Sequence, residues 1–183
     1  SQFTAYCEVV SKSNVSMERD YEYTSKRFYS DILKPKQLGS IAAEHAVKKL
    51  NPQKIKSEKI SLIFEKRISK NFLSIFSSAI SSSGTTNLYF QNGSKTFEDL
   101  VKSENKILYI KETIGHGTNI INGDYSVGAS GMMIENGEFS YPVSEITIAG
   151  NLNNIFKNIT LADDLEFNYA TNSPTMLVEG MVV

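Results

Sequence analysis

The segment that most constrains the fold is MMIENGEFSYPV, residues 132–143, in which Asn136 and Gly137 separate two stretches of alternating apolar and polar residues. Asn-Gly readily takes the positive φ angles of a type I′ turn, whose twist suits two antiparallel strands. This is the clearest β-hairpin signal in the chain. We therefore expect antiparallel sheet to dominate the second half of the molecule.

Hydrophobic spacing predicts both strands and helices in the rest of the chain. FTAYCEVV (3–10) and VSMERDYEY (15–23) are rich in β-branched and aromatic residues and predict a second hairpin. Apolar residues at intervals of three and four predict a helix between Pro35 and Pro52, and another over 68–79. The further elements expected are strands at 59–64, 107–114, 145–150 and 176–183, a short helix capped by Thr96, and a helix within 151–159.

Composition excludes or disfavours several classes of protein. A single cysteine, Cys7, excludes a disulfide within the chain. The 19 basic and 20 acidic residues give a net charge of −1, and no window concentrates Lys and Arg, so a nucleic-acid partner is not indicated. No apolar run approaches the roughly 20 residues that cross a bilayer. These features fit a cytoplasmic protein without a membrane partner.

The loop GHGTNIINGDYSVGASG, residues 115–131, is the strongest candidate for a functional loop. It contains five glycines, Asp124 and one of the two histidines, His116. Acid–base chemistry would require His116 to meet carboxylates such as Asp124, Glu135 or Glu145. Carboxylates beside glycine turns more often cap backbone N–H groups or face water, so the loop is predicted to hold a shape. The residues expected to line a cavity or an interface are His116, Asn119, Asp124, Tyr125 and Ser126.

A catalytic or metal-binding set is not evident elsewhere. A zinc site needs about three ligands, often with two histidines at close helical spacing, and the chain has no such pair. Cys7, His45 and His116 are far apart in sequence, and His45 lies in a helical apolar stripe, where a packed histidine without a role is expected. GASGM (128–132) lacks the GxSxG pattern of a serine nucleophile. No residue is therefore assigned as catalytic or as a metal ligand.

One long stretch resembles a known family. GDYSVGASGMMIENGEFSYPVSEITIAGNLNNIFKNIT (123–160) is similar to the C-terminal signature of the TldD/PmbA family, in its PmbA (TldE) branch. MERDYEYTSKRFYSDI (17–32), TTNLYFQNGSKTFEDL (85–100) and MLVEGM (176–181) resemble the same branch in the same order. The resemblance thus covers nearly the whole chain.

The resemblance implies a cytosolic bacterial metallopeptidase assembly in which a TldD-type subunit pairs with a PmbA-type subunit. The family is associated with peptide maturation and toxin–antitoxin turnover, and older descriptions call its members modulators of DNA gyrase. The TldD-type chain supplies zinc through HExxxH on a helix, and this motif aligns with SIFSSA (74–79). Ser74 and Ala79 stand at the histidine positions and Ile75 at that of the glutamate. The resemblance therefore implies no cofactor in this chain and zinc in its partner.

Two further positions depart from the family pattern. Ser173 stands where members often carry a cysteine, and Val127 replaces the arginine of GDYSRG. Members also carry an N-terminal α/β domain and a long segment before TTNLY. We therefore expect a fragment of a larger two-domain protein: 1–83 ending an N-terminal or central α+β region, and 84–183 forming a C-terminal β-rich domain, with a segment missing between about 80 and 86. The expected fold class is α+β, with packed helices and an antiparallel, barrel-like C-terminal domain.

Three hypotheses for function follow. The main one is a non-catalytic subunit of a complex that acts on peptides or unfolded proteins, paired with a TldD-type subunit or, in its absence, as a homodimer. The second is a self-sufficient hydrolase that uses His116 with Asp124 or Glu145. The third is a stand-alone peptide-binding module.

Overall fold

The computed structural model describes residues 2–80, 87–115, 117–168 and 170–183, which form two compact units, 1–53 and 54–183. The division expected from the sequence was at 83/84. The compact units divide earlier because β3 (Lys59–Phe64) and α2 (Lys66–Ile80) pack with the strands that follow them. Residues 81–86 of the expected junction lie outside the described residues.

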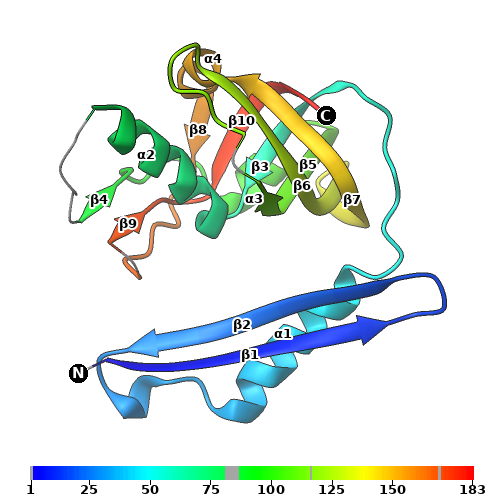
Figure 1. Ribbon diagram of the computed structural model, residues 1–183, viewed down its shortest axis with the longest axis vertical. Coiled ribbons are helices and arrows are strands. Elements are labelled where there is room, and N and C mark those ends of the chain that lie inside the picture. Colours follow the sequence, from blue (N-terminus) through cyan, green and yellow to red (C-terminus); the bar gives the residue numbers. More distant parts are fainter. Residues whose placement is uncertain (1, 81–86, 116, 169) are drawn as a thin grey trace. The chain divides into compact units, whose positions relative to one another are not determined.

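The first unit is a β-hairpin covered by one helix, as predicted (Figure 1). Strands β1 (Phe3–Lys12) and β2 (Met17–Lys26) pair antiparallel, and η1 (Tyr29–Asp31) leads to α1 (Pro35–Lys48). Pro35 begins the helix, where its missing N–H group would have no partner inside the helix. The buried residues of α1 recur every four positions and form one face: Leu38, Ala42 and Ala46.

Charged groups complete the contact between the helix and the hairpin. Lys49, which follows α1, places its Nζ 3.3 Å from the carboxylate of Asp20, a buried residue of β2. The Nδ1 atom of His45 lies 4.0 Å from the carboxylate of Glu22 on the same strand. His45 therefore packs against the hairpin, in keeping with the structural place predicted for it.

The second unit is built on a closed sheet (Figure 1). The strands in order around the barrel are β3, β5 (Lys106–Ile114), β6 (Asp124–Glu135), β7 (Glu138–Asn151) and β10 (Met176–Val182). The sheet closes because β10 pairs with β3 as well as with β7. The pair β3–β5 is parallel and the other neighbours are antiparallel. The predicted α+β fold with a barrel-like domain is confirmed.

The predicted turn joins β6 to β7. Asn136 and Gly137 have φ angles of 53° and 80°, as a type I′ turn requires. The prediction of a separate strand at 145–150 is wrong, because those residues continue β7 beyond Pro142. A β-bulge lies within this long strand. Glu145 has a φ of 54°, and the pairing register between β6 and β7 shifts beside it.

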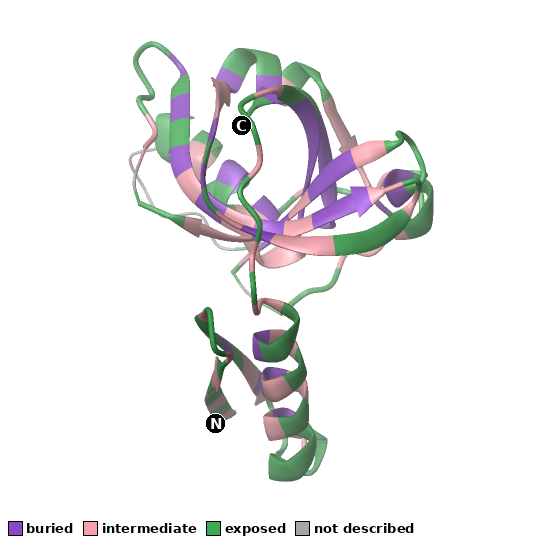
Figure 2. Cartoon of the chain, turned by 90° about the vertical axis from the view of Figure 1, so that its right-hand side faces the viewer, coloured by how far each residue is buried: buried purple, intermediate pink, exposed green. Residues whose placement is uncertain are grey.

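The barrel strands carry many buried residues (Figure 2), and the buried core that they form is apolar. Along β6 the buried residues alternate with more exposed ones, as expected for a strand with one face toward a core. Helix α2 adds Phe72, whose ring centroid lies 4.9 Å from that of Phe64 and 5.1 Å from that of Tyr125. The centre of the core consists of Leu62, Phe64, Phe72, Leu108, Ile110, Met133, Ile148, Met176 and Val178.

Short elements complete the unit. The predicted capping box of Thr96 and Asp99 opens α3 (Phe97–Val101), and α4 (Leu152–Lys157) lies within the predicted range. Strand β8 (Ile159–Leu161) pairs with β10, and β4 (Leu88–Tyr89) pairs in parallel with β9 (Thr171–Asn172). These three strands were not predicted, since two or three residues carry no readable periodicity. No helix among the described residues is long and apolar enough to cross a membrane.

Candidate functional site

The glycine-rich loop before β6 folds back on itself through backbone hydrogen bonds. The N–H of Asn119 donates to the carbonyl of Asp124, and the N–H of Gly123 donates to the carbonyl of Asn119, both at 2.8 Å. The N–H of Ser126 donates to the carbonyl of Gly117 at 2.7 Å. The loop therefore continues the sheet locally and ends in a tight turn.

Asparagine side chains organise the tip of this turn. The Oδ1 atom of Asn119 accepts from the N–H of Ile121, and that of Asn122 accepts from the N–H of Asp124, each at 3.0 Å. The side chain of Asn151 donates to the carbonyl of Asn122 at 3.0 Å and also caps α4. Asn and Asp use such bonds to replace backbone partners in turns.

Glycine is required at one point of the loop by close backbone approach. A Cβ atom added to Gly117 would lie 1.3 Å from the carbonyl oxygen of Ser126. No rotamer change relieves this clash, because the contacting atom belongs to the backbone. The loop thus depends on glycine to hold its shape, as the sequence predicted.

The predicted loop residues divide into surface and core. Asn119, Asp124 and Ser126 are exposed, whereas Tyr125 is only 5% exposed and packs on Phe72. Burial raises the pKa of the Tyr125 phenol above its usual value. The structure therefore places Tyr125 in the core rather than on the surface of the loop. His116 lies outside the described residues.

The carboxylates considered for acid–base chemistry do not converge. Asp124 pairs in register with Asn151, six residues beyond Glu145 on β7, which corresponds to roughly 20 Å at about 3.4 Å per residue. Glu135 lies at the opposite end of β6 from Asp124. Glu145 pairs instead with Lys54 at 3.1 Å on the surface. A joint site of these three carboxylates is excluded.

Helix α2 carries the positions that the family resemblance aligns with a zinc motif. Phe72 is buried in the barrel core and Leu73 is also buried, whereas Ser74 and Ala79 are exposed. The hydroxyl of Ser74 donates to the carbonyl of Lys70 at 3.2 Å, a bond within the helix. The side chains at 74 and 79 offer a hydroxyl and a methyl group, neither of which suits zinc, whose usual ligands are Cys, His and carboxylates.

Sequence reasoning missed a buried polar contact beneath α2. The hydroxyls of Ser69 and Ser173 lie 2.6 Å apart, and both residues are buried. Ser173 also donates to the carbonyl of Pro174 at 3.0 Å. The contact spans 104 residues of sequence. The one available signal was Ser69 itself, a polar residue within the apolar stripe of the predicted helix.

Charged groups surround the first turn of α2. Asp164 accepts from the N–H and the hydroxyl of Thr175 at 2.8 and 2.7 Å, and Lys66 forms ion pairs with Asp164 and Glu166. Burial, with a smaller contribution from neighbouring Arg67, lowers the pKa of Lys70. These groups are largely engaged with one another and tie the 164–175 segment to the helix.

The residues present do not fit a zinc ion. Within 2–80, 87–115, 117–168 and 170–183, no three His, Cys, Asp or Glu side chains lie close enough together to hold a metal. Ser173, at the position of a family cysteine, is buried and hydrogen-bonded to another serine. Zinc chemistry therefore has no support from this chain's described side chains.

The sequence matches one family model. Residues 77–183 match the PmbA/TldA metallopeptidase C-terminal domain. This range includes the glycine-rich loop and the last turn of α2.

Curated relatives match over a wider range. The chain is 25% identical over 264 aligned positions to the metalloprotease PmbA homolog of Haemophilus influenzae, covering 100% of this chain and 58% of the relative. It is 26% identical to metalloprotease PmbA of Escherichia coli O157:H7, covering 96% and 57%. The chain thus spans a little over half the length of these relatives. The 264 aligned positions exceed the chain's 183 residues by 81, so the relative has additional residues within the matched span.

Solved structures share the fold. A Bacteroides thetaiotaomicron protein described as a candidate modulator of DNA gyrase superposes with a TM-score of 0.87 at 18% identity, covering 99% of this chain and 59% of that one. TldE from Thermococcus kodakarensis superposes with a TM-score of 0.77 at 12% identity, covering 100% and 63%. Both are similar to this chain over both of its compact units.

Proposed function

The chain belongs to the PmbA/TldD metallopeptidase family, and we propose that it is a non-catalytic subunit of a peptide-degrading complex. Its partner would be a TldD-type chain that binds zinc, and its substrates would be peptides or unfolded proteins. In the absence of that partner, the same surface would support a homodimer, since related subunits commonly assemble about a two-fold axis.

One observation carries the proposal. The helix that the family resemblance aligns with the zinc motif packs into the core, and by that alignment Ser74, Ile75 and Ala79 stand at the ligand and glutamate positions. A framework retained without its catalytic residues suits a chain that completes or supports the site of another chain. The name of one structural relative, TldE, agrees with a paired role.

The glycine-rich loop supports an interface role. Ile121 is 93% exposed and Ile120 is 56% exposed at the tip of a turn that is held by asparagine side chains. Two adjacent exposed isoleucines on an ordered turn form an apolar projection that a partner surface could cover. Asn119, Asp124 and Ser126 are exposed residues of the same loop and would contribute to a polar rim.

Each of the two alternative functions would require a different property of this chain. A self-sufficient hydrolase would use His116 with Asp124 or Glu145, and these two carboxylates lie on distant parts of the β6–β7 pair, so at most one of them could serve. A stand-alone peptide-binding module would bind extended peptides without a partner. No contact among the described residues favours either over the subunit proposal.

Purified protein, alone and mixed with a TldD-type chain, tests the proposal. Light scattering should report a homodimer alone or a heterodimer in the mixture, and hydrolysis of an unfolded protein should appear only with the partner. The partner alone serves as the control. Peptidase activity of this chain by itself, or a strict monomer that never captures the partner, would contradict the proposal.

A further inference from the structure

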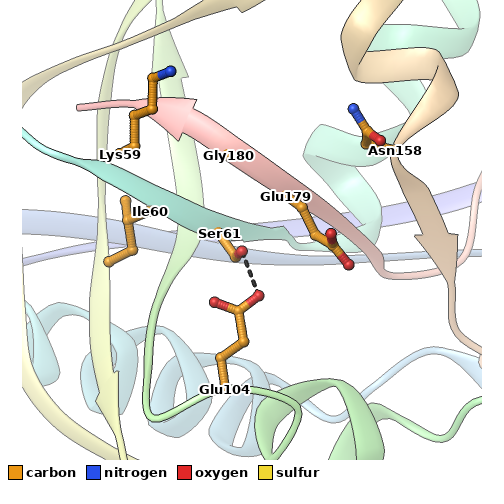
Figure 3. Close-up of a pocket in the computed structure, with 7 residues that line it drawn as sticks. All are labelled: Lys59, Ile60, Ser61, Glu104, Asn158, Glu179 and Gly180. Atoms are coloured by element: carbon orange, nitrogen blue, oxygen red, sulfur yellow. Dashed lines mark hydrogen bonds between the residues drawn. The ribbon is translucent and has the colours of Figure 1, made fainter.

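The strand edges of the two compact units differ. In the second unit the barrel strands close into a ring, and a closed sheet has no edge strands. A β-bulge shifts the register between β10 and β3 at Val178 and Met181, and beside it Ser61 donates to Glu104 at 2.6 Å in a small polar pocket (Figure 3). The first unit is instead a two-stranded sheet, so β1 and β2 each have one outer edge.

Side chains of the first unit occupy the outer edge of β2. The N–H of Tyr21 donates to the carboxylate of Asp20 at 2.8 Å, and that of Tyr23 donates to the carboxylate of the preceding glutamate at 3.0 Å. The carbonyl of Arg19 accepts from the Nζ of Lys49 at 3.4 Å. The odd-numbered residues of β2 therefore point their backbone groups away from β1. Charged side chains block this edge, as is common for edge strands.

The register of the hairpin shows which backbone groups lie on the outer edge of β1. In an antiparallel pair, opposite residues that do not bond to each other both point their N–H and C=O groups outward. Tyr21 lies opposite Glu8, and Arg19 lies opposite Val10. The outward groups of β1 therefore belong to its even-numbered residues, Thr4, Tyr6, Glu8, Val10 and Lys12. Within residues 2–80, 87–115, 117–168 and 170–183, no hydrogen bond reaches these outward groups.

Exposed apolar side chains lie at the turn end of the same hairpin. Helix α1 covers one face of the hairpin (Figure 1), and the buried and half-buried residues of β1 alternate with its exposed ones. Val10 is 60% exposed, Met17 is 67% exposed, and Val15 in the turn is 86% exposed. An open backbone edge beside exposed apolar residues is the arrangement that pairs with a further strand.

We propose that β1 pairs antiparallel with β1 of a second copy of this chain, about a two-fold axis at Val10. Val10 then lies opposite Val10 of the second copy, and Glu8 lies opposite Lys12 of the second copy, twice by symmetry. Opposite charges facing each other across a strand pair are stabilising, and like charges are destabilising. An axis at Glu8 would place two glutamates face to face, and an axis one residue to either side would place Glu8 opposite an uncharged residue. Charge complementarity therefore selects both the partner and the register.

The charged residues of β1 are available for this pairing. Glu8 lies 3.4 Å from Arg19 within its own copy, and both side chains are substantially exposed. Lys12 forms no ion pair with the described residues. The proposal does not depend on the subunit function, because β1 lies outside residues 77–183, which match the family model.

Sedimentation velocity of the full chain at increasing concentration tests the pairing. The unmodified chain should pass from monomer to dimer. Val10→Pro removes an outward N–H but no hydrogen bond to β2, so this variant should stay monomeric with an unchanged circular dichroism spectrum. Arg19→Pro is the matched control, because it removes an N–H from the outer edge of β2, and it should still dimerise. A monomer at every concentration, or a dimer that survives Val10→Pro, would overturn the proposal.

Charge reversal tests the register. Glu8→Lys should weaken self-association about tenfold, because lysines would face each other across the two edges. Lys12→Glu should weaken it similarly, because glutamates would then face each other. An equal mixture of the two variants should dimerise again, since every lysine then lies opposite a glutamate, and a folding defect could not produce this recovery. A mixture that associates no better than either variant alone would contradict the pairing.

A variant of the glycine-rich loop separates this proposal from the subunit function. Ile121→Asp alters the exposed projection of that loop and should leave dimerisation through β1 unchanged. Loss of the homodimer in this variant, with Val10→Pro still dimeric, would overturn the β1 pairing and leave the subunit proposal standing.

Discussion

The glycine-rich loop and helix α2 are in contact through the rings of Tyr125 and Phe72, yet different forces hold them. The turn before β6 is held by backbone hydrogen bonds and asparagine side chains, and its isoleucines face water. Helix α2 is held by burial of Phe72 in the barrel core, against which Ile68 and Ile75 also pack. Both regions look functional in the sequence. In the structure, the asparagine side chains of the loop stabilise its turn. The serine hydroxyls of α2 either face solvent or, in the case of Ser69, form a buried hydrogen bond with Ser173.

The comparison shows that several polar side chains of both regions are already hydrogen-bonded to the backbone of their own segment. Asn119 and Asn122 bond to the backbone of their own turn. The exposed hydroxyls of Ser74 and Ser78 bond to carbonyls of α2 itself. Neither region offers an assembled catalytic set among the described residues, so we expect substitutions in both to change stability or assembly rather than chemistry.

The largest expected effect is in the helix. Phe72→Ala should lower the free energy of unfolding by about 3–5 kcal/mol, because it leaves a cavity between two aromatic rings. Ser74→Ala, on the exposed face of the same helix, should cost less than about 0.5 kcal/mol. Chemical denaturation monitored by circular dichroism measures both. Similar costs for the two variants would mean that α2 is not anchored in the barrel core.

The buried serine pair should give the next largest effect. Ser173→Ala should lower the free energy of unfolding by about 1–3 kcal/mol, because the hydroxyl of Ser69 loses its buried partner. Ser69→Ala should cost less, since Ser173 keeps its bond to Pro174. The double variant should cost less than the sum of the two single ones. Strictly additive losses in the same denaturation assay would show that the two hydroxyls are not coupled.

Alkaline pH should weaken the contact between the loop strand and the helix. Burial raises the pKa of Tyr125, so the folded state keeps its phenol proton above the pH at which the unfolded chain loses it. The stabilisation is complete below the ordinary tyrosine pKa of about 10 and is lost as pH rises beyond it, by up to about 1.4 kcal/mol per pH unit. Tyr125→Phe should reduce this loss in denaturation curves at pH 9 to about 11. An unchanged pH dependence would place the phenol in water.

The smallest of the four stability effects is expected in the loop. Asn151→Ala should cost about 1 kcal/mol, because it removes the cap of α4 and the bond to Asn122. Asp124→Asn, on the strand directly opposite, is the matched control and should be nearly neutral. Differential scanning calorimetry would resolve the two. A greater loss for the Asp124 variant would indicate that its charge is structurally engaged.

Local signals made much of the fold predictable. Asn136 and Gly137 specify a turn that depends only on adjacent residues, and the capping box at Thr96 is equally local. Barrel closure depends on β10 pairing with β3, more than a hundred residues earlier, and no local pattern records such a pairing. The two-residue strands β4 and β9 are likewise set by tertiary contacts.

The candidate sites were less predictable for the same reason. The sequence offered Asp124 and Glu145 as alternative partners of His116, but strand register places these two carboxylates on distant parts of the β6–β7 pair. The pairing of Ser69 with Ser173 and the bulge at Glu179 depend on how distant strands align. Residue types suggested candidate groups, whereas only the fold shows which of those groups meet.

Peptide hydrolysis by the assembled pair tests most directly whether this chain supports the complex without supplying catalytic residues. The measurement compares the unmodified pair with two others: one carrying Asp124→Asn and Glu145→Gln in this chain, and one with a zinc-binding histidine of the TldD-type partner replaced. Our account predicts that the first keeps its rate within about twofold and that the second loses activity. Loss of hydrolysis in the first pair, with assembly intact by light scattering, would contradict it.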